Sequence, residues 1–344
     1  MRARAAAALL AALLLAGCAG GGDPDIAAPA PPVAAPHLAD GAIVAEDGAR
    51  LPLRRWLPDG PVKATVLALH GFNDYSNAFT GPAEEWAKHG IATYAYDQRG
   101  FGLAPDHGYW VGTWRLDQDL ALASRLVAAR HPGVPHYLLG ESMGGAVVMT
   151  AVTGAAGAAR PVDDGIILSA PAVWGRQVMN IFERTALWAA DTILPAMTVT
   201  GQGLNIKASD NIEMLRALSR DPLLIKATRI DTVEGLVDLM TLALDAAPRL
   251  DGPALVLYGE HDEIIPPDAM RRMVAALPPA DAAERRLAFY ANGYHMLLRD
   301  LEGPLVERDV ASWIANHAAA LPSGADNLAV ARLSLDAAHV PAGG

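Results

Sequence analysis

Residues 136–145 read His-Tyr-Leu-Leu-Gly-Glu-Ser-Met-Gly-Gly, and this stretch is the most informative part of the chain for predicting its fold. Four residues typical of a buried strand lead into Gly140-x-Ser142-x-Gly144, and small and apolar residues follow at 146–151. This order predicts a strand, a sharp turn at Ser142 and a tightly packed helix. A serine at such a turn has unfavourable backbone angles, so the residues two before and two after it must be small.

Ser142 is the candidate nucleophile of this turn. The spacing Gly-x-Ser-x-Gly is common by itself, but between a strand and a helix it is typical of a catalytic serine rather than of a structural turn. The serine stands at the N-terminus of the expected helix, where free N–H groups favour developing negative charge. We therefore expect nucleophilic catalysis at this position.

The rest of the chain alternates short apolar strands with helices. Strands are expected at 64–69, 91–96, 136–139, 165–168, 254–258 and 286–290, after a hairpin at 43–57 that turns at Asp47-Gly48. Helices are expected at 79–88, 113–129, 267–277 and 304–319. Continuous apolar strands separated by helices predict an α/β fold, with a mostly parallel central sheet covered by helices on both faces.

The alternation of strand and helix breaks between residues 172 and 249. This stretch has several helical segments, large apolar side chains and no clear strand. It predicts a helical cap, or lid, inserted into a core that residues 39–171 and 250–321 form, with 322–344 as a C-terminal tail. An apolar cap over Ser142 would form a pocket for an acyl chain and exclude water from the site.

The first residues of the chain are typical of an export signal. Two arginines precede an Ala/Leu run at 5–16, which is too short to span a bilayer but suits a signal peptide. Leu-Ala-Gly-Cys at 15–18 resembles a bacterial lipobox, in which the cysteine is lipidated and becomes the mature N-terminus. We expect residues 1–17 to be a lipoprotein signal peptide and Cys18 to be the lipidation site. The alternative is an ordinary signal peptide with an incidental cysteine.

Residues 18–38 are nearly all Gly, Ala and Pro after the cysteine, and such a segment cannot bury a face. We expect an extended tether. The residue after the cysteine is Ala19 rather than aspartate, which in a Gram-negative cell implies sorting to the outer membrane. The expected location is thus the bacterial cell envelope, with a lipid anchor in the membrane.

Composition excludes several classes of function. The chain has 344 residues, 52% of them hydrophobic, and a formal net charge of −11. An acidic protein without a basic run is a poor candidate for binding nucleic acid. Cys18 is the only cysteine, so no intrachain disulfide can form. No metal-ligand spacing, phosphate loop or dinucleotide fingerprint occurs, so we expect neither a metal nor a cofactor; the oligomeric state is not indicated.

Three motifs together resemble a known family. They are Gly-Glu-Ser-Met-Gly-Gly at 140–145, His-Gly at 70–71 and Tyr-Asp-Gln-Arg-Gly-Phe-Gly at 96–102. They resemble the monoacylglycerol lipase and lysophospholipase branch of the α/β-hydrolases, the serine aminopeptidase S33-type hydrolases. The resemblance runs from about residue 42 to residue 321, and it is weak in the insertion. It implies the α/β-hydrolase fold and a Ser-His-Asp triad in the chain order serine, acid, histidine.

Three histidines remain as candidates for the base, because six of the ten precede Ser142 and one lies in the tail. They are His261, His295 and His317, of which His295 resembles the family's base in the loop after the last strand. Strand 254–258 leads into Gly-Glu-His-Asp-Glu-Ile-Ile-Pro at 259–266, where the family usually has Gly-x-x-Asp before a Val/Ile-Pro pair. This points to Asp262 as the acid, with Glu260 and Glu263 as rivals.

An oxyanion hole needs two preorganised donors. One is the backbone N–H of Met143, directly after the nucleophile, and the resemblance implies the N–H of Phe72 as the other. His70 is then expected to hold the loop rather than to act as a base. Asp97 and Arg99 are expected to brace the loops under the site as a charge pair.

The sequence therefore predicts a serine hydrolase that cleaves carboxylic esters of single-chain lipids, monoacylglycerol-like or lysophospholipid-like, through an acyl-enzyme. Small-ester carboxylesterases, peptidases and acyltransferases use the same scaffold, and the fold does not choose between them. Related proline iminopeptidases usually have Trp after the serine, where this chain has Met143. A non-catalytic, lipid-anchored envelope binding protein is the remaining alternative.

Overall fold

The computed structural model describes residues 32–201, 203, 206–279, 284–327 and 329. The expected signal peptide, Cys18 and most of the tether lie outside these residues, so those predictions are not tested by the fold. Within the described part of the chain, no helix is both long and apolar enough to cross a membrane.

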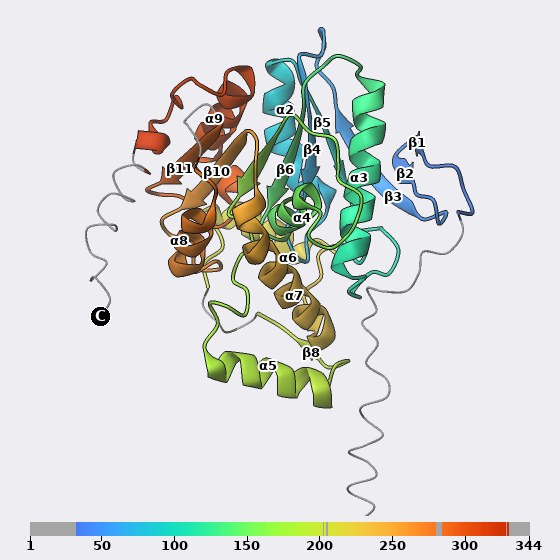
Figure 1. The fold of residues 1–344 in the computed structure, drawn as a ribbon, viewed down its shortest axis with the longest axis vertical. Helices are drawn as coiled ribbons and strands as arrows, with labels where there is room; N and C mark the ends of the chain where they lie inside the picture. The colour runs from blue at the N-terminus through green and yellow to red at the C-terminus, as the bar shows by residue number, and fades with distance from the viewer. Residues whose placement is uncertain (1–31, 202, 204–205, 280–283, 328, 330–344) are drawn as a thin grey trace, which may run out of the picture. The chain divides into compact units, whose positions relative to one another are not determined.

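A nine-stranded sheet forms the centre of the protein (Figure 1). Its order is β1-β2-β3-β5-β4-β6-β7-β10-β11, with antiparallel pairing from β1 to β5 and parallel pairing from β5 to β11. The strands are β1 His37–Ala39, β2 Ala42–Val44, β3 Arg50–Trp56, β4 Ala64–Leu69, β5 Ile91–Tyr96, β6 His136–Glu141, β7 Gly165–Ser169, β10 Ala254–Gly259 and β11 Arg285–Tyr290. The predicted mostly parallel sheet and the hairpin at its edge are confirmed.

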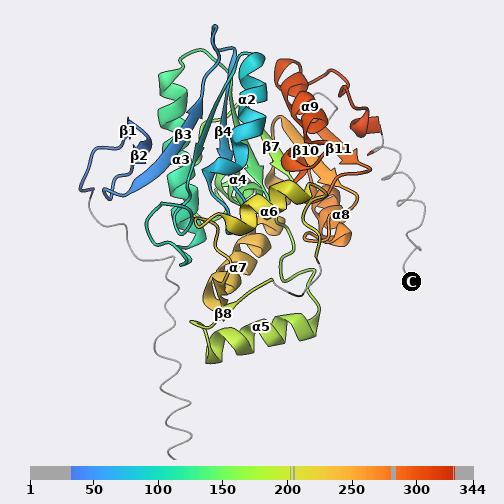
Figure 2. The same ribbon diagram turned by 180° about the vertical axis from the view of Figure 1, so that it is seen from behind.

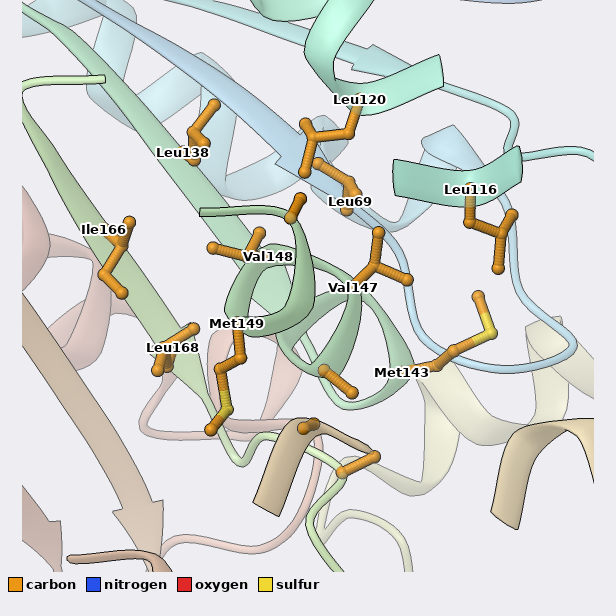
Figure 3. Packing of buried hydrophobic residues seen from close by; sticks show 14 of the residues in the cluster. Leu69, Leu116, Leu120, Leu138, Met143, Val147, Val148, Met149, Ile166 and Leu168 are labelled. Carbon is orange, nitrogen blue, oxygen red and sulfur yellow. The ribbon is translucent and has the colours of Figure 1, made fainter. Parts of the chain in front are cut away.

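Helices cover both faces of this sheet, as predicted (Figures 1 and 2). Those on one face are α3 Thr113–Arg130, α4 Met143–Thr153 and α8 Pro267–Ala276; those on the other are α2 Thr80–Lys88 and α9 Gly303–Ala315. Side chains of a strand point alternately to the two faces, so Leu67 and Leu69 pack against α3 and α4, whereas Val66 and Ala68 pack against α2 and α9. Figure 3 shows α4 in the first of these layers.

The segment 172–249 contains three helices, α5 Ile181–Ile193, α6 Ile212–Arg220 and α7 Ile230–Ala246, and ends in a 3₁₀ turn, η3 Ala247–Arg249. The expectation of no strand there was wrong, because β8 Thr198–Val199 pairs with β9 Thr228–Arg229. No residue of α5 is buried, and both views place it away from the sheet. In contrast, α7 contributes apolar side chains to the main core beside α4.

Three boundaries differ from the prediction by more than a shift of one or two residues or change the assignment of a segment. Strand β1 begins at His37, inside the predicted tether, because the edge of β2 offers free backbone groups for pairing. Helix α9 ends at Ala315 rather than at 319, since Asn316 has extended backbone angles. The predicted tail starts with a packed segment, where Asp326 forms a 2.5 Å ion pair with Arg286.

Candidate active site

The turn at Ser142 is as sharp as the motif predicts. Ser142 has φ 53° and ψ −117°, in the half of conformational space that side chains disfavour. A Cβ on Gly140 would lie 2.3 Å from the carbonyl oxygen of Gly144, and a Cβ on Gly144 would lie 2.2 Å from that of Leu69. No side chain fits at either glycine, so the two glycines allow the strand, the turn and α4 to approach one another.

His295 is paired with Asp262 in a buried site. The Nδ1 atom of His295 lies 2.8 Å from Oδ2 of Asp262, and both side chains are almost fully buried. The second carboxylate oxygen accepts hydrogen bonds from the backbone N–H groups of Ile264 and Ile265, at 2.8 and 2.9 Å. The Ile-Ile pair of the motif therefore orients the carboxylate toward the imidazole.

The other two candidate histidines lie in different surroundings. The ring of His261 packs against that of Tyr294, with ring centroids 5.2 Å apart. His317 stacks on Trp313 of α9 at 4.3 Å, on the sheet face opposite α4. Of the acidic rivals, Glu263 accepts a hydrogen bond from a backbone N–H of segment 172–249.

The loop that carries Phe72 is held by the buried ring of His70. The Nε2 atom of His70 accepts a 3.0 Å hydrogen bond from the backbone N–H of Gln98, so Nδ1 carries the proton and donates to the Gly71 carbonyl at 2.8 Å. Burial lowers the pKa of His70, which keeps the ring neutral. Phe101 packs edge-on against both His70 and Phe72. His70 has the structural role that we expected, whereas the roles of Gln98 and Phe101 were missed although both lie in the quoted motif.

Asp97 and Arg99 do brace these loops, but the predicted charge pair between them is wrong. Asp97 accepts hydrogen bonds from Ser76 and from the backbone N–H of Leu103. Arg99 instead forms ion pairs with Asp119 at 2.6 Å and with Asp47 at 2.8 Å. Each charge is taken up by other parts of the chain, Asp97 by residues 76 and 103 and Arg99 by residues 47 and 119, so the two do not pair with each other.

Ser142 and His295 line one cavity of about 670 Å³. Most of its wall is apolar, and most of the apolar residues come from segment 172–249, among them Trp174, Met179, Leu187, Ile206, Val233, Leu236, Val237 and Met240. Its charged lining is acidic, from Asp74, Glu141, Glu183 and Glu263, and no Lys or Arg is among the described residues of the wall. The cavity therefore suits an uncharged chain with an uncharged or cationic end.

Segment 172–249 is bonded to the loop that carries His295. The hydrogen bonds that join them include Met296 N–H to the Ala208 carbonyl, Ser209 Oγ to Asp300, and Asn211 Nδ2 to the Arg299 carbonyl, at 3.1, 2.6 and 3.0 Å. Among the described residues, no group of three or more His, Cys, Asp or Glu is placed to hold a metal ion.

The sequence pattern of the serine aminopeptidase S33 family matches residues 60–302, which include Ser142, Asp262 and His295. The chain belongs to this family. A monoacylglycerol lipase of Mycolicibacterium smegmatis is 28% identical over 289 residues, covering 78% of this chain and 94% of the relative. The monoglyceride lipase of Rattus norvegicus is 26% identical over 290 residues, covering 83% and 91%.

Solved structures show the same fold as this S33 family member. A soluble variant of the Saccharomyces cerevisiae monoglyceride lipase, in complex with a substrate analogue, has a TM-score of 0.66 at 19% identity, covering 84% of this chain and 96% of the other. The Paleococcus ferrophilus monoacylglycerol lipase has a TM-score of 0.61 at 22% identity, covering 78% and 99%. The predicted α/β-hydrolase fold is confirmed.

Proposed function

We propose that this S33 family member is a serine hydrolase that cleaves carboxylic esters of single-chain lipids, with monoacylglycerol-like substrates preferred. One observation carries the proposal: the strained Ser142 and the imidazole of the His295–Asp262 pair line the same apolar cavity. A serine at a sharp turn that lines a cavity together with an oriented base is the arrangement that nucleophilic acyl transfer needs.

The carboxylate of Asp262 determines which nitrogen of His295 acts as the base. Because a carboxylate only accepts hydrogen bonds, Nδ1 carries the proton and Nε2 has the free lone pair. Nε2 then takes the proton of Ser142 Oγ as that oxygen attacks the ester carbonyl. The imidazolium that forms is stabilised by the buried carboxylate.

The tetrahedral intermediate carries its negative charge on the former carbonyl oxygen. The N–H groups of Phe72 and Met143 are the proposed donors to this oxygen, and the N-terminus of α4 adds a favourable dipole. His295 returns its proton to the departing alcohol, which leaves the acyl group on Ser142. A water molecule, deprotonated by the same imidazole, then attacks the acyl carbon and releases the carboxylic acid.

The cavity supports a single acyl chain as the substrate. Its apolar wall can hold one chain, whereas a triacylglycerol needs room for three. The relatives reported above are monoacylglycerol and monoglyceride lipases. The acidic lining disfavours an anionic head group, so a monoacylglycerol is preferred over an anionic lysophospholipid.

We further propose that Cys18 is lipidated and that the mature chain is a bacterial envelope lipoprotein, in the outer membrane of a Gram-negative cell. Residues 1–17 would be removed as the signal peptide, and the tether after Cys18 would hold the enzyme near its amphiphilic substrate. The exposed apolar side chains of Phe182, Trp188 and Ile193 on α5 suit work at a lipid surface.

A substrate panel tests the proposal. It comprises monoacylglycerols of several chain lengths, the matching triacylglycerols, lysophosphatidylcholine, lysophosphatidylglycerol, p-nitrophenyl acetate and an aminoacyl amide. We expect the highest kcat/KM for a monoacylglycerol and labelling of the wild type, but not of Ser142→Ala, by a fluorophosphonate. Equal turnover of triacylglycerol, or activity confined to acetyl esters, would contradict the substrate assignment. Preferred cleavage of the amide would indicate a peptidase instead.

A further inference from the structure

A buried cluster of three charged side chains lies directly beside the proposed catalytic residues. The guanidinium of Arg299 lies between two carboxylates, with Nη2 at 2.5 Å from Glu141 Oε1 and Nη1 at 2.8 Å from Asp74 Oδ2. The exposed fractions of the three side chains are 9%, 3% and 5% for Arg299, Glu141 and Asp74. The three charges are therefore largely removed from water.

Each member of the cluster belongs to a different segment of the site. Glu141 directly precedes Ser142, Asp74 follows Phe72 by two residues, and Arg299 follows His295 by four. One guanidinium thus connects the nucleophile turn, the loop of the proposed oxyanion donor and the loop of the base.

The carboxylate of Glu141 also passes close to the oxyanion loop. A Cβ on Gly71 would lie 3.3 Å from the Cβ of Ser142 and 3.8 Å from Oε1 of Glu141. The carboxylate of Glu141 therefore lies close to Gly71, the residue before Phe72. Arginine can hold two carboxylates at once because its planar fork presents several donors, whereas lysine offers a compact point charge.

Stability alone gives a weak reason for such a cluster. Removing charges from water costs free energy that their mutual attraction only partly returns, and replacing a buried ionic triad by neutral groups is often neutral or stabilising. Catalysis gives a stronger reason, because an error of about 1 Å in the position of a reacting group can cost about 100-fold in rate.

We propose that Arg299 is a positioning residue of this hydrolase, holding the loops of Phe72 and His295 at the correct distance from Ser142 through Asp74 and Glu141. It touches no reacting atom. The inference rests on the proposed function, since it assigns a role within that reaction.

Two variants test the role of Arg299. Arg299→Lys keeps the charge but cannot bridge both carboxylates; we expect kcat on a monoacylglycerol to fall about 10-fold, with KM within about twofold. The triple variant Asp74→Asn/Glu141→Gln/Arg299→Met removes all three charges together, so no unpaired charge is left buried; we expect kcat to fall about 100-fold in a folded protein. Arg286→Lys is the matched control, because Arg286 pairs with Asp326 away from the cavity and its replacement should leave kcat unchanged.

A second readout separates positioning from a general loss of structure. A single-chain trifluoromethyl ketone accepts Ser142 Oγ at its carbonyl carbon and places an oxyanion between the proposed donors, whereas the matching ether only fills the cavity. Affinity for the ketone should fall in step with kcat, while affinity for the ether should stay constant.

The inference is overturned if Arg299→Lys keeps the wild-type kcat, or if ketone and ether affinity fall together. Should the triple variant fail to fold, Arg299→Lys alone decides. Failure of the proposed function would instead be visible in the wild type, which would neither hydrolyse esters nor react with a fluorophosphonate, and it would remove this inference as well.

Discussion

The indole of Trp86 and the backbone of Glu307 join the two helices that cover one face of the sheet. The Nε1–H group of Trp86, on α2, donates a 2.9 Å hydrogen bond to the backbone carbonyl of Glu307, on α9. This contact buries the side chain of Glu307 against α2, near a second carboxylate, Glu85. Burial is the larger cause and the negative charge of Glu85 the next, and they raise the pKa of Glu307 to about 7.

This raised pKa predicts a pH-dependent stability. The folded protein binds the proton of Glu307 more tightly than the unfolded chain does. Protonation of Glu307 therefore stabilises the folded state; this contribution is complete below about pH 4.5 and is lost as the pH rises through about 7. Glu307→Gln should raise the free energy of unfolding at pH 8 by about 1–3 kcal/mol and leave it unchanged at pH 4.5. Urea unfolding at both values measures this, with Glu84→Gln on the exposed side of α2 as the control. An equal effect at both pH values would contradict the assigned cause.

Ser142→Ala should abolish ester hydrolysis and leave the fold intact. In a comparable triad, loss of the nucleophile or the base costs about 10⁶-fold in kcat. His295→Ala should have an equal effect, because the two groups act as a unit. Initial rates on a monoacylglycerol, with circular dichroism to verify folding, check both variants. Activity of more than a few per cent of the wild-type rate in either variant would contradict the proposed mechanism.

Glycine substitutions at the nucleophile turn should separate steric from conformational cost. Gly144→Ala places a methyl group 2.2 Å from a backbone oxygen, so we expect a loss of more than about 3 kcal/mol, or insoluble protein. Gly81→Ala is the matched control, since its Cβ would meet no atom within 4 Å in the first turn of α2. That change should stabilise the protein by about 0.4–1 kcal/mol. Thermal unfolding of both variants is the measurement, and a stable Gly144→Ala protein would be the contrary result.

Ser209→Ala should weaken the connection between segment 172–249 and the loop of His295. It removes the 2.6 Å hydrogen bond to the buried carboxylate of Asp300, and hydrogen bonds to charged groups contribute about 1.5–3 kcal/mol. We expect a loss of stability of that order and a reduced kcat. Ser219→Ala is the control, because its hydroxyl bonds only within α6 at an exposed position. Identical unfolding curves for the two variants would show that the hydrogen bond of Ser209 does not contribute to stability.

Cys18→Ser should release the protein from the membrane fraction without changing the activity of the released enzyme. The proposed tether separates the anchor from the site, so the two properties should be independent. Cell fractionation with immunoblotting, followed by an esterase assay, provides the check. A variant that stays with the membrane would disprove lipidation at this cysteine.

The parts of the fold that the sequence predicted are those with a periodic or steric signal. Apolar runs identified the core strands, and the glycines around Ser142 identified the turn, because both patterns arise from local geometry. Strands β8 and β9 have two residues each, too few to show alternation. The start of strand β1 was assigned to the tether because its pairing depends on the free edge of β2, which no local pattern reveals.

In the candidate site, too, residues with a local sequence signal were predicted and residues placed by packing were not. Asp262 and His295 follow strands at positions that the family pattern marks, and the structure brings them into contact. The partners of Arg99 and Arg299 could not be predicted, since ion pairs between residues far apart in the chain depend on packing. The only signal for Arg299 was its position, four residues after His295.

The hydrogen bonds between residues 208–211 and the loop of His295 have a consequence for engineering and for the divergence of such enzymes. A lid taken from another enzyme would arrive without the groups that hold this histidine loop, so a chimera designed to change chain-length preference would also change the catalytic rate. A transplant confined to α5 and its flanking turns leaves these anchors in place. Selection acting on substrate range can therefore vary the outer helix freely, while residues 208–211 must change together with the loop to which they are bonded.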